Sequence, residues 1–178
     1  MNEIQYAQIT EHNFSGTSLD AFVRRQEVAR CWRWRGGQWK LLPVAYVEDW
    51  DLAGRRLRAG KLLRSVQDGE AAYGAWDGDA LVGFARLAGP RFGSAMQYID
   101  LAQFHVSAPY RGRGIGRTLF SMACQGARVM GAEKLYISAH SAEETMAAYR
   151  ALGCVEAEEI NWDLAKKEPC DVQMEYSL

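Results

Sequence analysis

The sequence is poor in the residues that build metal centres and disulfide frameworks. It has 3 histidines and 4 cysteines, all dispersed, and the cysteines form no CxxC pair. This dispersal argues against a zinc site, so we expect no metal. The simplest interpretation of the cysteines is four reduced thiols. They are Cys31, Cys124, Cys154 and Cys170.

Long apolar runs are also missing, which argues against a membrane-spanning segment. Residues 1–5 lack the basic and apolar regions of a secretion signal, so we expect a cytoplasmic protein with no membrane partner. Hydrophobic residues make up 48% and charged residues 24%, which is ordinary for a globular protein. Since no repeat or linker interrupts the chain, we expect one domain over residues 1–178.

The net charge of −1 is unevenly distributed. Residues 24–64 hold eleven Lys/Arg against four Asp/Glu, whereas residues 132–178 hold four against ten. A basic segment admits nucleic-acid binding as one hypothesis. Its arginines lie among apolar residues at amphipathic spacing, however, which favours a solvated face and no nucleic-acid partner.

Hydrophobic periodicity predicts both strands and helices. We expect strands at residues 4–9, 71–76, 80–87, 98–106, 134–139, 154–160 and 172–178, and a strand–turn–strand unit at 31–42. We expect helices at residues 18–28, after Asp49 or Asp51, at 117–129 and at 142–152. This order indicates a mixed α/β fold with helices on both faces of one sheet.

The most informative stretch is Arg-Gly-Arg-Gly-Ile-Gly at residues 111–116, between a predicted strand and a predicted helix. Glycines let the backbone approach an anion, and the free N–H groups of a helix N-terminus favour negative charge. The turn therefore suits a pyrophosphate. The dinucleotide pattern GxGxxG fails because Arg117 replaces its third glycine, and no Gly-Lys-Ser/Thr follows as in a P-loop. A purely structural turn is the remaining alternative.

Residues 104–116, Phe-His-Val-Ser-Ala-Pro-Tyr-Arg-Gly-Arg-Gly-Ile-Gly, resemble the central motif of the GNAT superfamily of acyl-CoA-dependent N-acyltransferases. Arg111, Gly114 and Gly116 take the defined places of its Arg/Gln-x-x-Gly-x-Gly/Ala turn. The detailed resemblance covers roughly residues 79–153. It implies a GNAT-like domain, mixed α+β, whose central sheet of about seven strands is mixed and mostly antiparallel.

The resemblance also implies acetyl-CoA as the cofactor. It places the pantetheine amides against the backbone of Phe104, His105 and Val106. It places the pyrophosphate on backbone N–H groups of Arg111, Gly112, Arg113, Gly114, Ile115 and Gly116. Arg113, Arg117 and Thr118 are further candidates for contact with the phosphates, and solvated side chains are the alternative for the two arginines.

A second motif, Ala-Ala-Tyr-Arg-Ala-Leu-Gly-Cys at residues 147–154, resembles the family's aromatic-Tyr-x-x-x-Gly-Phe segment. Tyr149 takes the place of the tyrosine that commonly protonates the departing thiolate, and a tyrosine packed on the sheet is the alternative. Ala148 and Cys154 depart from the motif, so the subfamily stays open. The pattern Ser-x-Glu-x-Thr-x-x-x-Tyr, formed by Ser141, Glu143, Thr145 and Tyr149, also resembles the streptothricin-acetylating branch.

An amine must lose a proton before it attacks, so a base or a water chain to one is expected. Asp100 is the first candidate, because it lies six residues before Val106, where the histone-acetylating branch carries a catalytic glutamate. His105 is the second candidate, since its ordinary pKa suits the task. A backbone N–H of Val106 or a neighbour is expected to stabilise the charge on the carbonyl oxygen.

We expect the acceptor to be a small-molecule primary amine that carries positive charge. Aromatic side chains and carboxylates suit a cation, and the regions that usually select acceptors in this family contain both. They are Trp32, Trp34, Trp39, Tyr46, Trp50 and Trp162, with Glu156, Glu158, Glu159, Asp163 and Glu168. Core or dimer contacts are the alternative for the tryptophans, so a homodimer stays open. The rival function is a non-catalytic acyl-CoA-binding module.

Overall fold

The computed structural model describes residues 3–178. Its main sheet has seven strands in the order β1-β4-β5-β6-β7-β9-β8. These are β1 (Gln5–Gln8), β4 (Ala72–Asp77), β5 (Ala80–Phe92), β6 (Tyr98–Val106), β7 (Lys134–Ala139), β9 (Val172–Ser177) and β8 (Val155–Glu156). Among the described strands only β6 and β7 pair in parallel. The predicted mixed and mostly antiparallel sheet is therefore confirmed.

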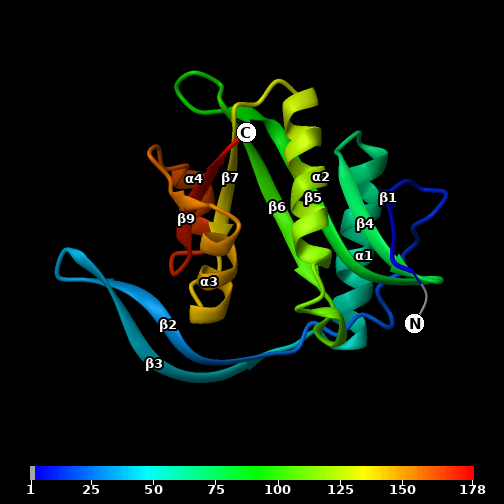
Figure 1. The fold of residues 1–178 in the computed structure, drawn as a ribbon, viewed down its shortest axis with the longest axis horizontal. Coiled ribbons are helices and arrows are strands. Elements are labelled where there is room, and N and C mark those ends of the chain that lie inside the picture. Colours follow the sequence, from blue (N-terminus) through cyan, green and yellow to red (C-terminus); the bar gives the residue numbers. More distant parts are fainter. Residues whose placement is uncertain (1–2) are drawn as a thin grey trace.

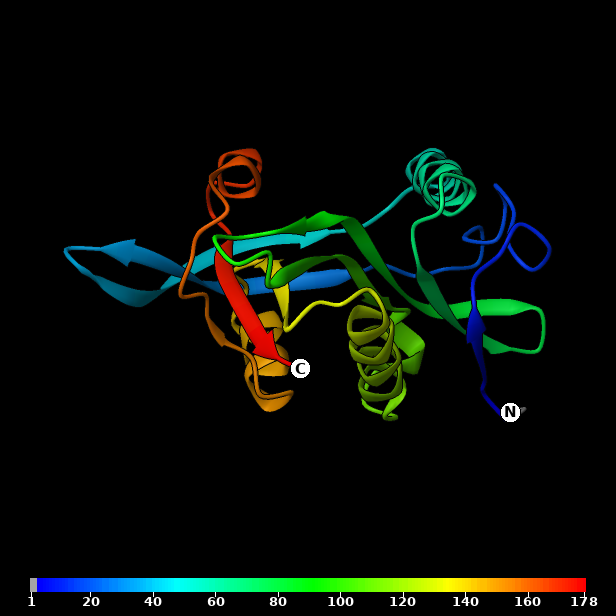
Figure 2. The same cartoon turned by 90° about the horizontal axis from the view of Figure 1, so that it is seen from above.

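Helices cover both faces of this sheet, as predicted (Figures 1 and 2). Helices α1 (Leu52–Gln67) and α4 (Trp162–Lys167) lie on one face, here called the α1/α4 face. Helices α2 (Ile115–Val129) and α3 (Glu143–Ala151) lie on the other, the α2/α3 face. Helix α2 buries Ile115, Leu119 and Ala123 at helical spacing against the sheet. None of the helices in residues 3–178 is long and apolar enough to cross a membrane.

The two parallel strands separate soon after they meet. Strand β6 pairs with β7 only from Tyr98 to Asp100, opposite Lys134 to Tyr136. Beyond this point the strands diverge towards the N-terminus of α2 (Figure 1). Residues 101–106 of β6 therefore pair with β5 on one side and with no described strand on the other. Since buried backbone groups need partners, this open edge is a place for a ligand to pair.

A second, two-stranded sheet crosses the end of the molecule beside α3. It consists of β2 (Gln26–Arg35) and β3 (Gln38–Glu48), joined by the predicted glycine turn, in which Gly36 and Gly37 have φ of 61° and 79°. The Trp32 N–H donates to the Ser141 carbonyl at 2.8 Å and fastens the hairpin to the chain after β7. The tip of the hairpin projects beyond α3 (Figure 1).

The helix predicted at residues 18–28 is wrong. Residues 16–21 form turns and β2 begins at Gln26. Leu19 and Phe22 are buried as the amphipathic pattern suggested, but against α1 and β5. The Val23 N–H donates to the Ser107 hydroxyl, and the Val23 carbonyl accepts from the Ala108 N–H. These long-range bonds satisfy the backbone that a helix would otherwise pair.

Other boundaries show how local patterns compete with tertiary contacts. Asp51 caps α1, as predicted, by accepting from the Gly54 N–H at 2.7 Å. Arg55, expected to face water, instead donates to the Asp20 and Phe22 carbonyls at 2.6 and 3.2 Å. Helix α4 was missed, because six residues are too few to show a helical period. The short 3₁₀ helix η1 (Ala108–Tyr110) links β6 to the glycine turn.

Candidate active site

The open edge of β6 presents the backbone of Phe104 and Val106. The Ser107 N–H donates to the Val82 carbonyl at 2.8 Å, and His105 stands opposite Phe84. Antiparallel bonds alternate along a strand, so the backbone groups of His105 face β5. Those of Phe104 and Val106 consequently point into the opening between β6 and β7. Of the three predicted pantetheine-pairing residues, Phe104 therefore has both backbone groups facing the opening, whereas Val106 offers its N–H, because its carbonyl accepts from Arg111.

The glycine turn ends at the bare N-terminus of α2. Gly114 is the N-cap, with φ of 82°, and no side chain caps the helix. Gly112 has φ of 75°, and at both glycines a Cβ would meet no atom within 4 Å. The first N–H groups of α2 therefore border open space at the positive end of the helix dipole. This cradle and the open β6 edge fit the pyrophosphate and pantetheine of a coenzyme A.

Arg111 holds the turn in place. Its Nε donates to the Val106 carbonyl at 3.1 Å and its Nη1 to the Arg25 carbonyl at 3.0 Å, which ties the turn to β6 and the chain before β2. The guanidinium of Arg113 lies 5.1 Å from the Tyr110 ring. The Thr118 hydroxyl bonds to the Gly114 carbonyl at 3.5 Å. The side chains of this turn thus shape the backbone cradle.

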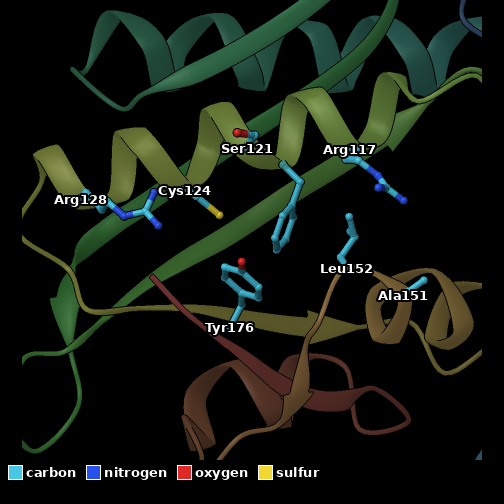
Figure 3. Close-up of a pocket in the computed structure, with 8 residues that line it drawn as sticks. Arg117, Ser121, Cys124, Arg128, Ala151, Leu152 and Tyr176 are labelled. Atoms are coloured by element: carbon cyan, nitrogen blue, oxygen red, sulfur yellow. The ribbon is translucent and has the colours of Figure 1, made fainter.

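Arg117 points into a groove between α2 and the end of α3 (Figure 3). The groove has a volume of about 240 Å³, and the edge-to-face pair of Phe120 and Tyr176 forms part of its wall. Arg117 lies near one end and Arg128 near the other. Its further lining residues are Ser121, Cys124, Ala151 and Leu152.

A β-bulge decides which β6 side chains reach each face. Leu101 pairs with Leu87 and Gln103 with Arg86, so Ala102 is an extra residue in β6. Before the bulge Leu101 packs on the α2/α3 face, and after it Phe104 contacts Phe120 of α2 and Tyr149 of α3. Alternation then places Asp100 and His105 on the α1/α4 face, opposite the expected cofactor side.

Tyr149 of α3 lies beside this opening. Its side chain is 9% exposed, and its ring centroid is 6.0 Å from that of Phe104. Within residues 3–178 its hydroxyl makes no hydrogen bond, and it is not among the buried polar atoms that lack a partner. Burial, with smaller contributions from Cys154, Asp171 and Asp100, raises the pKa of Tyr149 far above its ordinary value. The hydroxyl therefore stays protonated and can donate.

Asp100 occupies the last β6 position paired with β7, opposite Tyr136. Burial raises the pKa of Asp100 to about 6, although the positive charge of Arg86 acts against this rise. Arg86 donates to Gln103 at 3.0 Å and is paired with Glu70, so it stands close by without neutralising Asp100 directly. A carboxylate with this pKa is ionised at neutral pH and can accept a proton.

His105 lies in a different setting. Its ring contacts Trp50 and Phe84, with centroids 4.9 and 5.3 Å apart. Burial and the charges of Arg24, Arg58 and Arg111 lower the pKa of His105 to about 3. An imidazole so hard to protonate is a weak base at neutral pH, so the surroundings favour Asp100 for that task.

A hydrogen-bonded chain of polar side chains crosses β7 and β9 on the α1/α4 face. The Tyr136 hydroxyl accepts from the Asn161 N–H and donates to Gln173, at 2.9 and 2.8 Å. Gln173 donates to the Ser138 hydroxyl, which donates to Asp171, both at 3.0 Å. Sequence reasoning missed these residues. The signal was present as polar residues at every second position of 134–140 and 171–175.

The aromatic wall predicted for the acceptor is not assembled. Trp34 and Trp39 pack on each other at 5.3 Å near the hairpin tip, and Arg150 covers Trp32 at 4.9 Å. Trp162 is 66% exposed. Trp50 does face the site, through its contact with His105. Trp32 and Trp39 also pack against the main core, and the Tyr46 hydroxyl bonds to His140 at 2.8 Å, so the predicted residues are spread over several places and do not form one wall.

Comparison with protein families supports the motif resemblance. The sequence model of the Acetyltransferase (GNAT) family matches residues 27–154, which is well over half of the chain. This range contains β6, the glycine turn, α2 and Tyr149. Comparison with curated protein sequences gives no match.

Solved structures show the same fold across nearly the whole chain. A nourseothricin acetyltransferase is 16% identical, with a TM-score of 0.71 and 98% of both chains covered. A protein described as a streptothricin acetyltransferase from Bacillus anthracis, in complex with acetyl coenzyme A, is 13% identical with a TM-score of 0.68, over 99% of this chain and 98% of that one. An IAA acetyltransferase from Bacillus cereus is 15% identical with a TM-score of 0.58, over 99% and 100%.

Proposed function

This chain belongs to the Acetyltransferase (GNAT) family and is an acetyl-CoA-dependent acetyltransferase, and we propose that it acetylates the primary amine of a small molecule. One observation carries the proposal. A protonated phenol, Tyr149, and an ionised carboxyl, Asp100, flank the only open backbone edge that the described sheet presents between two of its strands.

The two proton transfers take place on different faces of the sheet. When bound, acetyl-CoA supplies the thioester carbonyl that the amine attacks. Asp100, on the α1/α4 face, removes a proton from the incoming ammonium group. The Tyr149 hydroxyl, near the α2/α3 face, donates its proton to the sulfur that leaves. A backbone N–H of Phe104 or Val106 points into the opening and stabilises the carbonyl oxygen.

The α1/α4 face suits an ammonium group. Asp100 stands opposite Tyr136 of β7, and Asp171 accepts from Ser138 of β7 at 3.0 Å, so both carboxyls lie along this strand. These two replace the acids predicted from sequence, of which Glu158 is paired with Lys134 and Glu159 with Ser94. Three neighbours in fold are named as nourseothricin, streptothricin and IAA acetyltransferases, which supports a small-molecule acceptor.

A thiol-release assay with acetyl-CoA and a panel of primary amines tests the proposal. Each amine is compared with its tertiary counterpart, which has no hydrogen to lose after attack. We expect release with primary amines and a large loss in Tyr149→Phe. Tyr176→Phe, in the groove of Figure 3, is the matched control. Binding of coenzyme A without release by any amine would instead support the non-catalytic module.

A further inference from the structure

We infer that the acceptor carries a carboxylate in addition to its amine, and that Arg24 and Arg58 bind this carboxylate beside Trp50. This inference rests on the proposed function and specifies its substrate class. The acceptors that it identifies are amino acids and related zwitterionic amines.

Two guanidinium groups gather on one tryptophan. The guanidinium carbon of Arg58 is 4.4 Å from the Trp50 ring centroid, and that of Arg24 is 5.8 Å away. Trp50 also contacts His105 of β6. The two arginines come from α1 and from the segment before β2, so the fold brings together charges that are distant in sequence. Like charges held together on an apolar surface favour a bound anion.

The carboxylates of the protein neutralise only one member of this pair. Arg24 donates to Glu48 at 2.9 Å and to the side-chain oxygen of Gln26 at 3.2 Å, and its side chain is only 11% exposed. Its Nε is buried and has no hydrogen-bond partner. Arg58 donates to the Gly54 carbonyl at 3.2 Å, and within residues 3–178 no carboxylate lies within ion-pairing distance of it. A buried N–H donor without a partner is costly, and a ligand oxygen would satisfy it.

The surrounding groups leave an excess of positive charge. Arg24, Arg58 and Arg111 all act on His105, and burial together with these three charges keeps that ring neutral. The acidic groups near Arg24 are Glu48 and Asp49. Arg111 donates to the Val106 and Arg25 carbonyls, and the terminal nitrogens of Arg24 donate to Glu48 and Gln26. Arg58 is therefore the arginine beside Trp50 that is left without an ion pair.

The pair also stands at the right place relative to the chemistry. Trp50, on which both arginines lie, contacts His105, and His105 stands between Phe104 and Val106 on the open edge of β6. Asp100 lies on the same strand, so positive and negative groups approach this edge from different parts of the chain. A ligand with an ammonium group near Asp100 and a carboxylate near Arg24 matches this arrangement. A diamine would place a cation against two arginines, which is unfavourable.

The test compares each amino acid with its own carboxamide in the thiol-release assay. The two differ at one group, which is a charged carboxylate in the acid and a neutral amide of similar size in the carboxamide. We expect wild-type protein to prefer the acid by about tenfold or more in kcat/KM, the size of one charge-assisted contact. Arg58→Gln should reduce that ratio by about tenfold. Arg56→Gln, one residue away in sequence but paired with Asp20 at 2.8 Å, should keep the wild-type ratio.

Equal use of acids and carboxamides by the wild type would overturn the inference and leave the proposed function standing. The inference is also overturned, with the proposed function left standing, if Arg58→Gln lowers kcat/KM for the acid and for its carboxamide by the same factor. If no amine causes the release of thiol from acetyl-CoA, the proposed function fails. The inference is then tested by measuring how tightly the amino acids bind to the protein. Isothermal titration with the amino acids should show binding to wild type, at least tenfold weaker binding to Arg58→Gln, and an unchanged affinity for Arg56→Gln. Equal affinity of the amino acids for the wild type, Arg58→Gln and Arg56→Gln would overturn the inference.

Discussion

Asp100 stands opposite Tyr136 in the last residue pair that β6 and β7 share before they separate. The carboxyl is therefore placed by the sheet itself, at the point where the ladder opens. The Tyr136 hydroxyl accepts from Asn161 and donates to Gln173, so it does not donate to Asp100. Burial without such a bond explains why the pKa of Asp100 is raised to about 6.

Asp100→Asn should lower turnover while it raises stability. The pKa of Asp100 is higher in the folded protein than the ordinary value, so ionisation opposes folding as the pH rises through this range and most strongly above about pH 6. We expect a gain of up to roughly 2 kcal/mol in the free energy of unfolding at pH 8 and almost none at pH 3.5. Urea unfolding at both pH values measures it. Asp79→Asn, in an exposed turn, is the control, and an equal gain in that variant would refute the account.

The same carboxyl predicts the pH dependence of the wild-type reaction. A base must be ionised to accept a proton, so kcat/KM should fall as the pH drops below about 6. In Asp100→Asn this fall should disappear from the residual activity. If kcat/KM falls at the same midpoint pH in the wild type and in Asp100→Asn, the base is a group other than Asp100.

Tyr149→Phe and Tyr136→Phe should separate catalysis from stability. The Tyr149 hydroxyl has no hydrogen bond within residues 3–178, so its loss should leave stability unchanged and lower kcat by roughly 10²–10⁴-fold. Tyr136 makes two hydrogen bonds, and its loss should cost about 1–3 kcal/mol. Thermal unfolding and thiol release measure both effects. Loss of coenzyme A affinity in Tyr149→Phe would point to a binding role instead.

Gly114→Ala should weaken coenzyme A binding more than it weakens the fold. With φ of 82° and open space around it, Gly114 would suffer backbone strain of about 1–2 kcal/mol but no clash. Gly36→Ala at φ of 61°, also in open space, carries the same strain far from α2. Titration calorimetry should show at least about tenfold weaker coenzyme A binding in the first variant alone. Equal affinities would show that the turn does not hold the phosphates.

Glu175→Gln tests the buried ion pair on β9. The Glu175 side chain is 3% exposed and lies 2.6 Å from Lys134. Burial opposes its ionisation, but hydrogen bonds from Lys134 and Tyr98 outweigh burial and hold the pKa of Glu175 below its ordinary value. Its stabilisation is therefore present at neutral pH and is lost as the pH falls through the acid range. We expect a loss of about 2–4 kcal/mol at pH 7 that shrinks below pH 4, and no loss in the exposed Glu156→Gln.

The sequence indicated more of the residues expected to bind the cofactor than of the residues proposed to bind the acceptor. The cradle at Gly112 and Gly114 follows from neighbours in the chain, because a glycine turn and a helix start are adjacent residues. The proposed acceptor side combines Arg24, Arg58 and Asp171, which lie in three stretches that are far apart in the chain. Which of these face one another depends on the bulge at Ala102 and on the turns at residues 16–21, and the sequence pattern showed neither.

The sequence by itself determined the order of most elements, the glycine turn and the family, because periodicity and short motifs are properties of consecutive residues. Only the tertiary structure decided which charges meet. The separation of β6 from β7 opens a backbone edge, and the packing of α1 and the β2–β3 ribbon brings two arginines to Trp50. Such contacts arise between residues far apart in the chain, where burial and pairing, rather than local preference, set the free energy.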